Sequence, residues 1–346
     1  MVTLKDIAEM CGVSTSTVSN VLNGINKAGD EVKQRVLAAV EETGYQPNFF
    51  AQGIRKTKTK TIGIIVEDLC QFTSPHIVET ILDHLEQNGY KTVLMNLRMY
   101  YRWKKSFVED PVVLNEALKS VLQQMRAIKV DGIIYVAAHT RVMKVMPDDF
   151  PIPTVFAYGY EDREGIPSVI IDDEASAYEL VSYLIGKGHR KIGVIAGSEE
   201  NFHTKARIKG FQRALFDAGI PFDPNSIHFG DWYWDSGYEL SKELLKNDYS
   251  ALWCMNDRMA SGAYVGSREL GFEVGKNLAI AGFDDHELSS SLYPTLTTLR
   301  LPLYDIGYKA AMLLVDMLEH PDSFAMPQSP FRVKGELVVR NSVNQR

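Results

Sequence analysis

The sequence predicts an α/β protein in which a small all-α helix-turn-helix headpiece is followed by two doubly wound parallel α/β lobes. Two observations lead to this prediction. Residues 4–44 carry apolar side chains at helical spacing, with glycine where the pattern breaks. From residue 62 onward, short apolar segments alternate with amphipathic helical stretches in two successive series, as right-handed βαβ units require. The expected domains are the headpiece (residues 1–46), a connecting segment (residues 47–60) and the two lobes (residues 61–346).

Three short helices are predicted in the headpiece, and the first buries Leu4, Ile7 and Ala8. Gly12 is placed to end this helix, because glycine readily takes the positive φ of a tight turn, and Ser14 is placed to cap the next one. The second helix has an apolar stripe formed by Val18, Val21 and Leu22. The third is expected over residues 30–42, before a glycine stop at Gly44. Its inward side chains are expected to be Val32, Val36, Leu37 and Val40.

The outer face of the second helix is short, polar and uncharged. It presents Thr15, Ser16, Thr17, Ser19 and Asn20. Asparagine can pair with adenine through two hydrogen bonds in the major groove, and serine or threonine can hydrogen-bond several bases. This face therefore predicts a helix that reads DNA. The alternative is a small helical hairpin whose hydroxyl groups only cap helices and contact water.

Charge is distributed unevenly along the chain. The whole sequence holds 37 Lys/Arg and 44 Asp/Glu, a balance that would argue against nucleic acid if it were uniform. Residues 1–60, however, hold eight Lys/Arg and six Asp/Glu, so the remainder carries a net charge of −9. Residues 45–60 carry four positive charges and no negative one. Such a tract can contact DNA phosphates and release counterions, although a solvated linker is the alternative.

The composition favours a cytoplasmic protein without a cofactor. The N-terminus lacks the apolar core of a signal peptide, and no apolar run approaches the length of a membrane span. Cys11, Cys70 and Cys254 are few, widely spaced and odd in number, which indicates reduced thiols rather than a disulfide framework or a zinc site.

Nine segments of the remaining chain have the composition of buried parallel strands. They are residues 62–66, 92–95, 132–136, 154–157, 169–171, 191–196, 227–229, 252–255 and 278–281. In open α/β sheets a ligand binds beyond the carboxyl ends of the strands. We therefore expect a small-molecule site between the two lobes, built from residues that follow these segments.

Aromatic and polar side chains follow several of the predicted strands. The candidates are Phe72, Tyr158, His203, Arg207, Trp232, Asp257 and Asp284. Aromatic faces stack on a flat ring, while aspartate and arginine hydrogen-bond its hydroxyls or polar edges. Each residue has an alternative, because an aromatic after a strand is more often part of the core and an aspartate there often caps a helix. Convergence from several strand ends favours a shared ligand site.

These motifs closely resemble those of the lactose repressor and purine repressor family, over essentially the whole chain. The headpiece motifs are Gly12-Val13-Ser14, Thr17-Val18-Ser19, Asn23, Gly44-Tyr45, Pro47-Asn48 and Ala51. The later motifs are Gly188-His189-Arg190-Lys191-Ile192-Gly193, Ala206-Arg207-Ile208-Lys209-Gly210-Phe211, Asn256-Asp257 and Gly282-Phe283-Asp284-Asp285. The resemblance implies lobes of the type I periplasmic-binding-protein-like fold. It also implies that Thr15, Ser16 and Asn20 read bases, and that Arg207, Trp232 and Asp257 line an effector cleft.

The resemblance further implies a hinge helix, matched here by residues 48–55, that enters the minor groove of a two-fold operator. In the family a leucine wedges into the central base step, and Ile54 stands at that place in this chain. Isoleucine can also serve as an apolar wedge. Gly53 lowers helix propensity by about 1 kcal/mol relative to alanine, so the hinge is expected to be less helical without DNA.

The implied function is that of a transcriptional repressor. It would bind a palindromic double-stranded operator as a homodimer, with an affinity modulated by a small effector. A sugar-like effector is favoured, a nucleobase or nucleoside is the alternative, and a phosphoprotein corepressor is a further candidate partner. A transport-type solute-binding protein shares the two-lobed plan but would need a signal peptide and no headpiece. An enzyme is disfavoured, because neither the pair His203 and Asp257 nor the run Asp284-Asp285-His286 forms a known catalytic or metal motif.

The stretch from Arg98 to Val113 is longer than the family pattern. Basic and aromatic residues alternate in it, namely Tyr100, Tyr101, Arg102, Trp103, Lys104 and Lys105. It is either a solvated surface insertion or a lid or partner-protein surface near the cleft.

Overall fold

The computed structural model describes residues 2–22, 24–25, 27–45, 59–103, 111–147, 149–161, 163, 165–328 and 330–346. The chain divides into two compact units. The first is Met1–Thr59 with Ala127–Lys129, and the second is Lys60–Arg126 with Val130–Arg346. The predicted hinge helix, including Ile54, lies outside the described residues.

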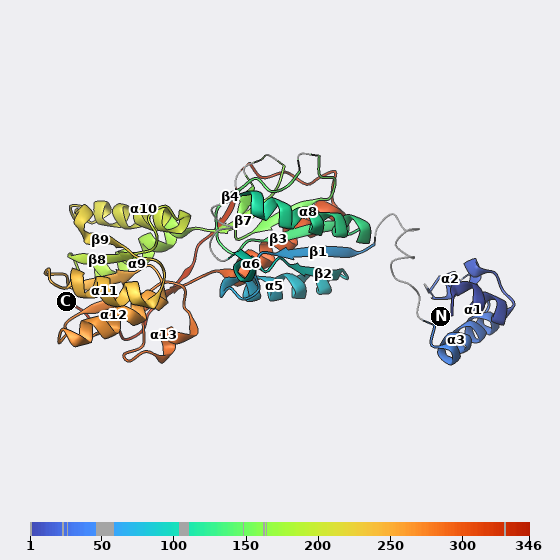
Figure 1. Cartoon of the computed structure of the whole chain (residues 1–346), viewed down its shortest axis with the longest axis horizontal. Helices are drawn as coiled ribbons and strands as arrows, with labels where there is room; N and C mark the ends of the chain where they lie inside the picture. Colours follow the sequence, from blue (N-terminus) through green and yellow to red (C-terminus); the bar gives the residue numbers. More distant parts are fainter. Residues whose placement is uncertain are drawn as a thin grey trace. The chain divides into compact units, whose positions relative to one another are not determined.

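The first unit contains the three predicted headpiece helices, α1 (Leu4–Cys11), α2 (Thr15–Leu22) and α3 (Asp30–Thr43) (Figure 1). Gly12 and Gly44 both have φ 62° at helix C-caps, which confirms the two predicted stops. A capping box between Thr3 and Asp6 starts α1, a signal that the helical pattern alone does not give. The prediction for Leu37 was wrong: it is 46% exposed, because Val36 beside it and Ala39 occupy the buried face.

The N-terminal lobe of the second unit is built on a six-stranded parallel sheet of order β13-β7-β5-β3-β1-β2. Its strands are β1 (Thr61–Val66), β2 (Lys91–Asn96), β3 (Gly132–Val136), β5 (Thr154–Ala157), β7 (Ser168–Ile171) and β13 (Phe331–Val333). A short parallel pair, β4 (Val142–Met143) and β6 (Tyr160–Glu161), lies outside this sheet.

Helices cover both faces of this sheet. A Cβ on Gly132 would meet Leu314 of α14 (Leu303–Glu319), whereas a Cβ on Gly63 would meet Met125 of α8 (Pro111–Ile128). Because Gly132 pairs with Ile62, the neighbour of Gly63, the two glycines face opposite sides of the sheet. Helix α5 (Thr73–Gln87) packs beside α14, so α5 and α14 cover one face and α8 covers the other (Figure 1).

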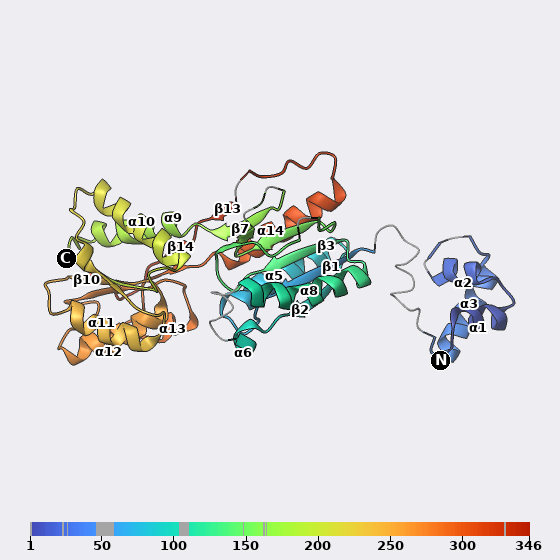
Figure 2. The same ribbon diagram turned by 45° about the horizontal axis from the view of Figure 1, so that its top comes forward.

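The C-terminal lobe has a four-stranded parallel sheet of order β11-β10-β8-β9. Its strands are β8 (Ile192–Ala196), β9 (Ile227–Phe229), β10 (Ala251–Cys254) and β11 (Ala279–Ala281). The helix pair α9 (Asp173–Gly186) and α10 (Phe202–Asp217) lies on one side of the sheet (Figure 2). The pair α11 (Trp234–Leu244) and α12 (Asp257–Glu269) lies on the other, and a short helix α13 (Glu287–Ser291) follows β11.

The chain crosses between the lobes after β7, after β12 (Thr298–Arg300) and after β13. Strand β14 (Glu336–Val338) follows the last crossing and pairs antiparallel with β12. All nine predicted strands are confirmed, with ends that differ by at most one residue. The predicted fold class, a helical headpiece followed by two parallel α/β lobes, is therefore confirmed. Within the described ranges, no helix has the length and apolar character needed to cross a membrane.

Candidate DNA-reading and effector-binding sites

The second headpiece helix begins with a network of hydroxyl groups. Ser14 Oγ accepts a hydrogen bond from the Thr17 backbone N–H at 3.1 Å, which confirms the predicted cap. The same oxygen lies 2.7 Å from Ser16 Oγ and 2.8 Å from Thr17 Oγ1. Thr15 and Ser16 are exposed, Thr17 and Asn20 are half-buried, and Ser16 and Asn20 lie one turn apart on one face. The helix therefore has a polar outer face, and two of its hydroxyls also support the cap.

Arg207 of α10 is the centre of a buried cluster that lies where the lobes meet. It is 3% exposed, its Nε donates to Asp173 Oδ1 at 2.8 Å, and a terminal nitrogen donates to the Met255 carbonyl. The guanidinium carbon lies 3.6 Å from the centroid of the Phe283 ring and 5.7 Å from that of Trp232. A carboxylate, a carbonyl and two aromatic rings therefore hold this arginine in one orientation.

His203 lies one turn before Arg207 and binds the same carboxylate. Its Nδ1 is 2.7 Å from Asp173 Oδ2, and its Nε2 accepts a hydrogen bond from the Thr140 backbone N–H at 3.3 Å. These two partners place the ring proton on Nδ1. Because Thr140 follows β3, this hydrogen bond joins the N-terminal lobe to the C-terminal lobe. Burial alone would raise the pKa of Asp173, but His203 and Arg207 hold it below its usual value.

Three predicted site residues have backbone conformations that residues other than glycine rarely adopt. Tyr158, Trp232 and Asp284 have φ values of 62°, 74° and 121°, and each follows the end of a strand. The Tyr158 ring centroid lies 5.7 Å from that of His203. The Trp232 ring packs so closely on Gly197 that a Cβ there would lie 1.9 Å from Trp232 Cζ2. Backbone strain of this kind concentrates at functional sites.

Two aspartates of the C-terminal lobe have raised pKa values. Burial raises the pKa of Asp284 to about 7, against the lowering effect of Arg207. Among the residues that the structure describes, no group donates a hydrogen bond to its carboxylate. Asp257 is fully buried, and it accepts hydrogen bonds from the Thr298 hydroxyl at 2.6 Å and the His286 backbone N–H at 2.8 Å. Burial, and after it the charge of Asp284, raises the pKa of Asp257 well above its usual value.

The candidate residues thus form two neighbouring groups. The first surrounds the Arg207–Asp173 pair and contains Tyr158, His203, Trp232 and Asp284. The second contains Asp257 and Phe72, which are linked by His286. The Phe72 ring centroid lies 4.8 Å from that of His286, and the His286 backbone N–H donates a hydrogen bond to Asp257. The role of each residue as an effector contact stays a prediction.

Sequence reasoning missed a second charged cluster, at the ends of β1 and β3. Glu67 is fully buried, and its Oε1 and Oε2 accept hydrogen bonds from Arg141 at 2.6 Å and 3.0 Å. Oε1 also accepts from the Tyr135 hydroxyl and Oε2 from the Ala138 backbone N–H, both at 2.7 Å. Burial would raise the pKa of Glu67, but Arg141 and these donors lower it. The carboxylate is therefore fully satisfied within its own lobe.

The stretch from Arg98 to Val113 reaches this cluster. Its first residues form α6 (Met99–Trp103), and residues 104–110 lie outside the described part of the chain. The Tyr100 hydroxyl hydrogen-bonds His139 Nε2, and its backbone N–H donates to Asp68 at 3.0 Å. Burial raises the pKa of Tyr100 to about 12 and lowers that of His139 to about 4. The stretch is therefore anchored in the N-terminal lobe at Tyr100, whereas Tyr101 is 78% exposed.

A helix with a polar outer face in a headpiece, joined to a two-lobed α/β receptor with a buried charged site, defines a ligand-responsive DNA-binding regulator. Residues 3–48 match the family described as bacterial regulatory proteins, lacI family, and residues 181–343 match the periplasmic binding protein-like domain. The catabolite control protein A of Priestia megaterium is 33% identical over 339 residues, which cover 96% of this chain and 98% of that protein. The chain therefore belongs to the LacI family of bacterial regulatory proteins.

Solved structures agree with this assignment. The Lac repressor dimer bound to operator and the anti-inducer ONPF has a TM-score of 0.80 to this chain at 25% identity, with 99% of both chains covered. The complex of the transcriptional regulator CelR with cellobiose has a TM-score of 0.65 at 25% identity, covering 99% of this chain and 100% of that one. The protein is a transcriptional regulator with a helix-turn-helix and an effector-binding domain, and its relatives are regulators rather than enzymes.

Proposed function

We propose that this regulator acts in the cytoplasm as a repressor that binds a palindromic operator as a homodimer. Residues 1–46 would read DNA, residues 47–60 would form the hinge and linker, and residues 61–346 would bind the effector and dimerise. The similar Lac repressor was solved as a dimer on its operator, which supports this arrangement. One headpiece makes too few contacts for high specificity, so two-fold pairing on a palindrome follows.

The effector is proposed to be a sugar or sugar derivative that binds around Arg207. The observation that carries this proposal is the half-buried Asp284 carboxylate beside Arg207, with the rings of Tyr158 and Trp232 next to it. Sugar hydroxyls donate to a carboxylate and accept from a guanidinium, while aromatic faces pack on the apolar side of the ring. The complex of CelR with cellobiose supports the same ligand class.

The contact between the lobes offers a way for an effector to act on the operator-bound state. The Thr140–His203 hydrogen bond joins the lobes, so an effector that binds there competes with or adds to this contact. Only a ligand with different affinities for the two arrangements of the lobes can change operator affinity. We propose such a difference without assigning its sign.

A thermal-shift screen tests the effector proposal. The full chain is incubated with sugars, sugar phosphates, nucleobases and nucleosides, because a ligand of the native state raises the melting temperature. A sugar is expected to raise the melting temperature and also to change operator affinity, measured by fluorescence anisotropy. A nucleoside as the stabilising ligand would replace the sugar assignment. A ligand that stabilises the protein at saturation without changing operator affinity would contradict the regulatory role. If operator affinity responded to the ligand only when a phosphoprotein was added, that phosphoprotein would be identified as a corepressor.

The DNA-reading residues are proposed to be Thr15, Ser16, Thr17 and Asn20 in the major groove and Ile54 in the minor groove. Asn20→Ala is expected to relax the preference at one base position of each half-site, by about 1–3 kcal/mol, because a paired amide discriminates between bases. A random-oligonucleotide selection measures this change, with Gln34→Ala on the exposed side of α3 as a matched amide control. A uniform loss of affinity for all sequences would mean that Asn20 only positions the backbone.

A further inference from the structure

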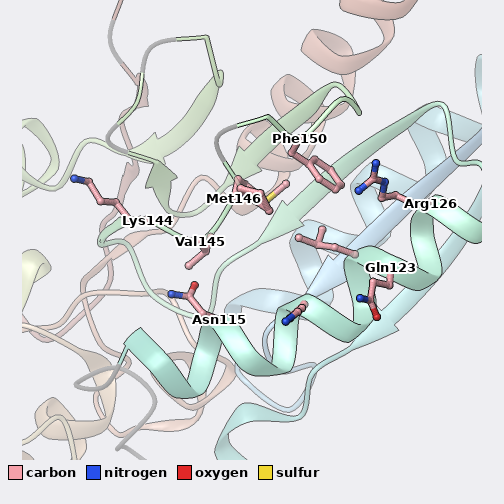
Figure 3. A pocket seen from close by; sticks show the side chains of 10 residues that line it. Asn115, Gln123, Arg126, Lys144, Val145, Met146 and Phe150 are labelled. Atoms are coloured by element: carbon pink, nitrogen blue, oxygen red, sulfur yellow. The ribbon is translucent and has the colours of Figure 1, made fainter.

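A hollow of about 450 Å³ lies in the N-terminal lobe, between α8 and the segment that follows β4 (Figure 3). Its volume is within the usual range of small-molecule pockets. It is lined by Asn115, Lys119, Leu122, Gln123, Arg126, Lys144, Val145, Met146, Pro147 and Phe150. None of these residues belongs to the inter-lobe site, so the hollow is a separate feature of the molecule.

The two walls of the hollow differ in chemistry. The α8 wall presents a row of exposed polar side chains at intervals of four, four and three residues, namely Asn115, Lys119, Gln123 and Arg126. This spacing places them on one face of the helix, along about 16 Å of its length. The opposite wall is mostly apolar, with Val145 and Met146 buried and Phe150 half-buried. Figure 3 shows the Phe150 ring facing the end of α8 that carries Arg126.

The charged residues described in the lining of the hollow are all positive. Lys119, Arg126 and Lys144 are cationic, and the described residues that line the hollow include no Asp or Glu. Arg126 and Lys144 lie at opposite ends of the hollow in Figure 3. Like charges that line one cavity repel each other, and an anion bound between them relieves that repulsion.

The apolar wall is held in place from behind. The buried Glu161 carboxylate accepts hydrogen bonds from the backbone N–H groups of Val145 at 3.1 Å and Met146 at 3.4 Å. Arg163 donates to the Pro147 carbonyl at 3.1 Å. A ligand would therefore meet a wall whose backbone is already fixed, which lowers the cost of ordering it on binding.

A second hollow, of about 380 Å³ in the C-terminal lobe, provides an internal comparison. It also has an apolar floor, which includes Phe211 and Leu215, but its two cations Arg190 and Lys191 are accompanied by Asp223 and Asp248. Lys191 is paired with Asp248 at 3.1 Å. The charges of this hollow are balanced, so it has no reason to select an anion.

We propose that the hollow between α8 and the residues Lys144–Pro147 and Phe150 binds a small anionic molecule that also carries an apolar ring. Its carboxylate, sulfonate or phosphate group binds at Lys119 and Arg126 of α8, Lys144 attracts it from the opposite end of the hollow, and its ring packs on Met146 and Phe150. The chemistry of the two walls selects this class, because a cationic row and an apolar wall together match a molecule with one charged and one apolar end. The site would give the regulator a second ligand that is independent of the inter-lobe effector.

Two fluorescent dyes with the same aromatic rings test the proposal. Anilinonaphthalene sulfonate carries an anionic group, and phenylnaphthylamine is its uncharged counterpart. Both are titrated into the full chain and into Lys119→Gln/Arg126→Gln, with Arg190→Gln/Lys191→Gln as the matched control in the other hollow. The sulfonate is expected to bind the first variant about tenfold more weakly, equivalent to about 1.4 kcal/mol. The uncharged dye is expected to bind all three proteins with the same affinity.

Several outcomes overturn the proposal. They are an unchanged sulfonate affinity in the α8 variant, an equal loss for both dyes, or a larger loss in the control variant. An equal loss would describe an apolar docking surface without charge selection. Thermal melting checks that each variant is folded, and Lys144→Gln alone provides a second measurement on the opposite wall, where a smaller loss for the sulfonate only is expected. Because no operator or sugar is used, the result is independent of the proposed effector role of Arg207.

Discussion

Each lobe has a buried pair of a carboxylate and an arginine near the place where the lobes meet, but the surroundings of the two pairs differ. In the N-terminal lobe the fully buried Glu67 is held by Arg141, with a tyrosine hydroxyl and a backbone N–H as further donors. In the C-terminal lobe Asp173 is held by Arg207 and His203. Both carboxylates have a pKa below the usual value despite burial, because Arg141 lies beside Glu67, and His203 and Arg207 lie beside Asp173.

The two clusters differ in the number of further acidic side chains that lie beside them. Asp284 and Asp257 lie beside the Arg207 cluster, and burial raises the pKa of both. The N-terminal cluster is electrically complete, whereas the C-terminal one holds more carboxylate than its nearby cations neutralise. Perturbed carboxylates in a strained backbone are typical of binding sites. We therefore propose that ligand recognition lies mainly in the C-terminal lobe and that the Glu67–Arg141 pair has a structural role.

Exchanging each arginine for lysine gives the largest expected effect. Lysine keeps the charge but loses the planar fork and the stacking on aromatic rings, so it cannot replace Arg207 between Asp173 and Phe283. Arg207→Lys is expected to weaken effector binding more than tenfold and to leave operator affinity without effector unchanged. Arg141→Lys is expected to keep effector binding. Both variants are expected to lower the free energy of unfolding by about 1–3 kcal/mol, since each leaves a buried acceptor less satisfied.

Calorimetric titration with the effector found in the screen, together with operator anisotropy, measures both variants. If Arg141→Lys abolished effector binding as completely as Arg207→Lys, the proposed division between the two lobes would be wrong. Loss of operator binding by Arg207→Lys, with effector affinity intact, would refute its assignment as an effector contact.

A methyl group at Gly197 is expected to produce the next largest effect. Its Cβ would lie 1.9 Å from Trp232 Cζ2, so the indole ring has to leave its present position beside the Arg207 guanidinium. Gly197→Ala is therefore expected to weaken effector binding by about tenfold. Gly186→Ala, at the end of α9 in the same lobe, is the control, because a Cβ there meets no atom within 4 Å. An unchanged effector affinity in Gly197→Ala would remove Trp232 from the site.

Much of this architecture is encoded locally and could be predicted. The nine strands were found because buried parallel strands are continuous apolar runs, and the headpiece helices because glycine and serine mark their ends. The strands β4, β6, β12, β13 and β14 were missed, because they have only two or three residues and four of them contain a charged residue, which the equally short β9 and β11 do not. Leu37 shows a similar limit: the helical pattern allows either Val36 or Leu37 to face inward, and only packing decides between them.

The effector-binding site was predicted only in part, because sequence rules relate residues that are close in the chain. Rules on strand ends found Tyr158, Trp232 and Asp284, but the same rule applied to Asp172-Asp173 and Glu67-Asp68 would also have found the two buried acids. Arg207 was itself among the candidates, but the residue that each buried acid binds could not be found this way. Arg207 and Arg141 lie 34 and 74 positions away from the carboxylates that they bind, and no local pattern relates residues at that separation.

The dependence of stability on pH gives the smallest expected effect and tests the acid Asp284, whose charge also raises the pKa of Asp257. Because burial raises the pKa of Asp284 to about 7, the folded protein holds a proton that the unfolded chain releases above about pH 4. Between these values the free energy of unfolding falls as pH rises, since the folded state binds more protons. Asp284→Asn does not titrate and is expected to lose this component. Arg207, Asp173 and Arg258 face the carboxylate and are unchanged in the variant.

The absolute slope is not diagnostic, because other groups in the site titrate in the same range. Burial lowers the pKa of His139 to about 4, which makes the folded state more stable as pH rises from about 4 to 6.5. Asp257 acts in the same direction as Asp284. The measurement is therefore the difference between Asp284→Asn and the unmodified chain in chemical unfolding at pH 5, 6, 7 and 8. The variant is expected to gain stability relative to the unmodified chain as pH rises to about 7. A difference that does not change with pH would show that Asp284 is an ordinary ionised carboxylate rather than a carboxyl group that keeps its proton in the folded state.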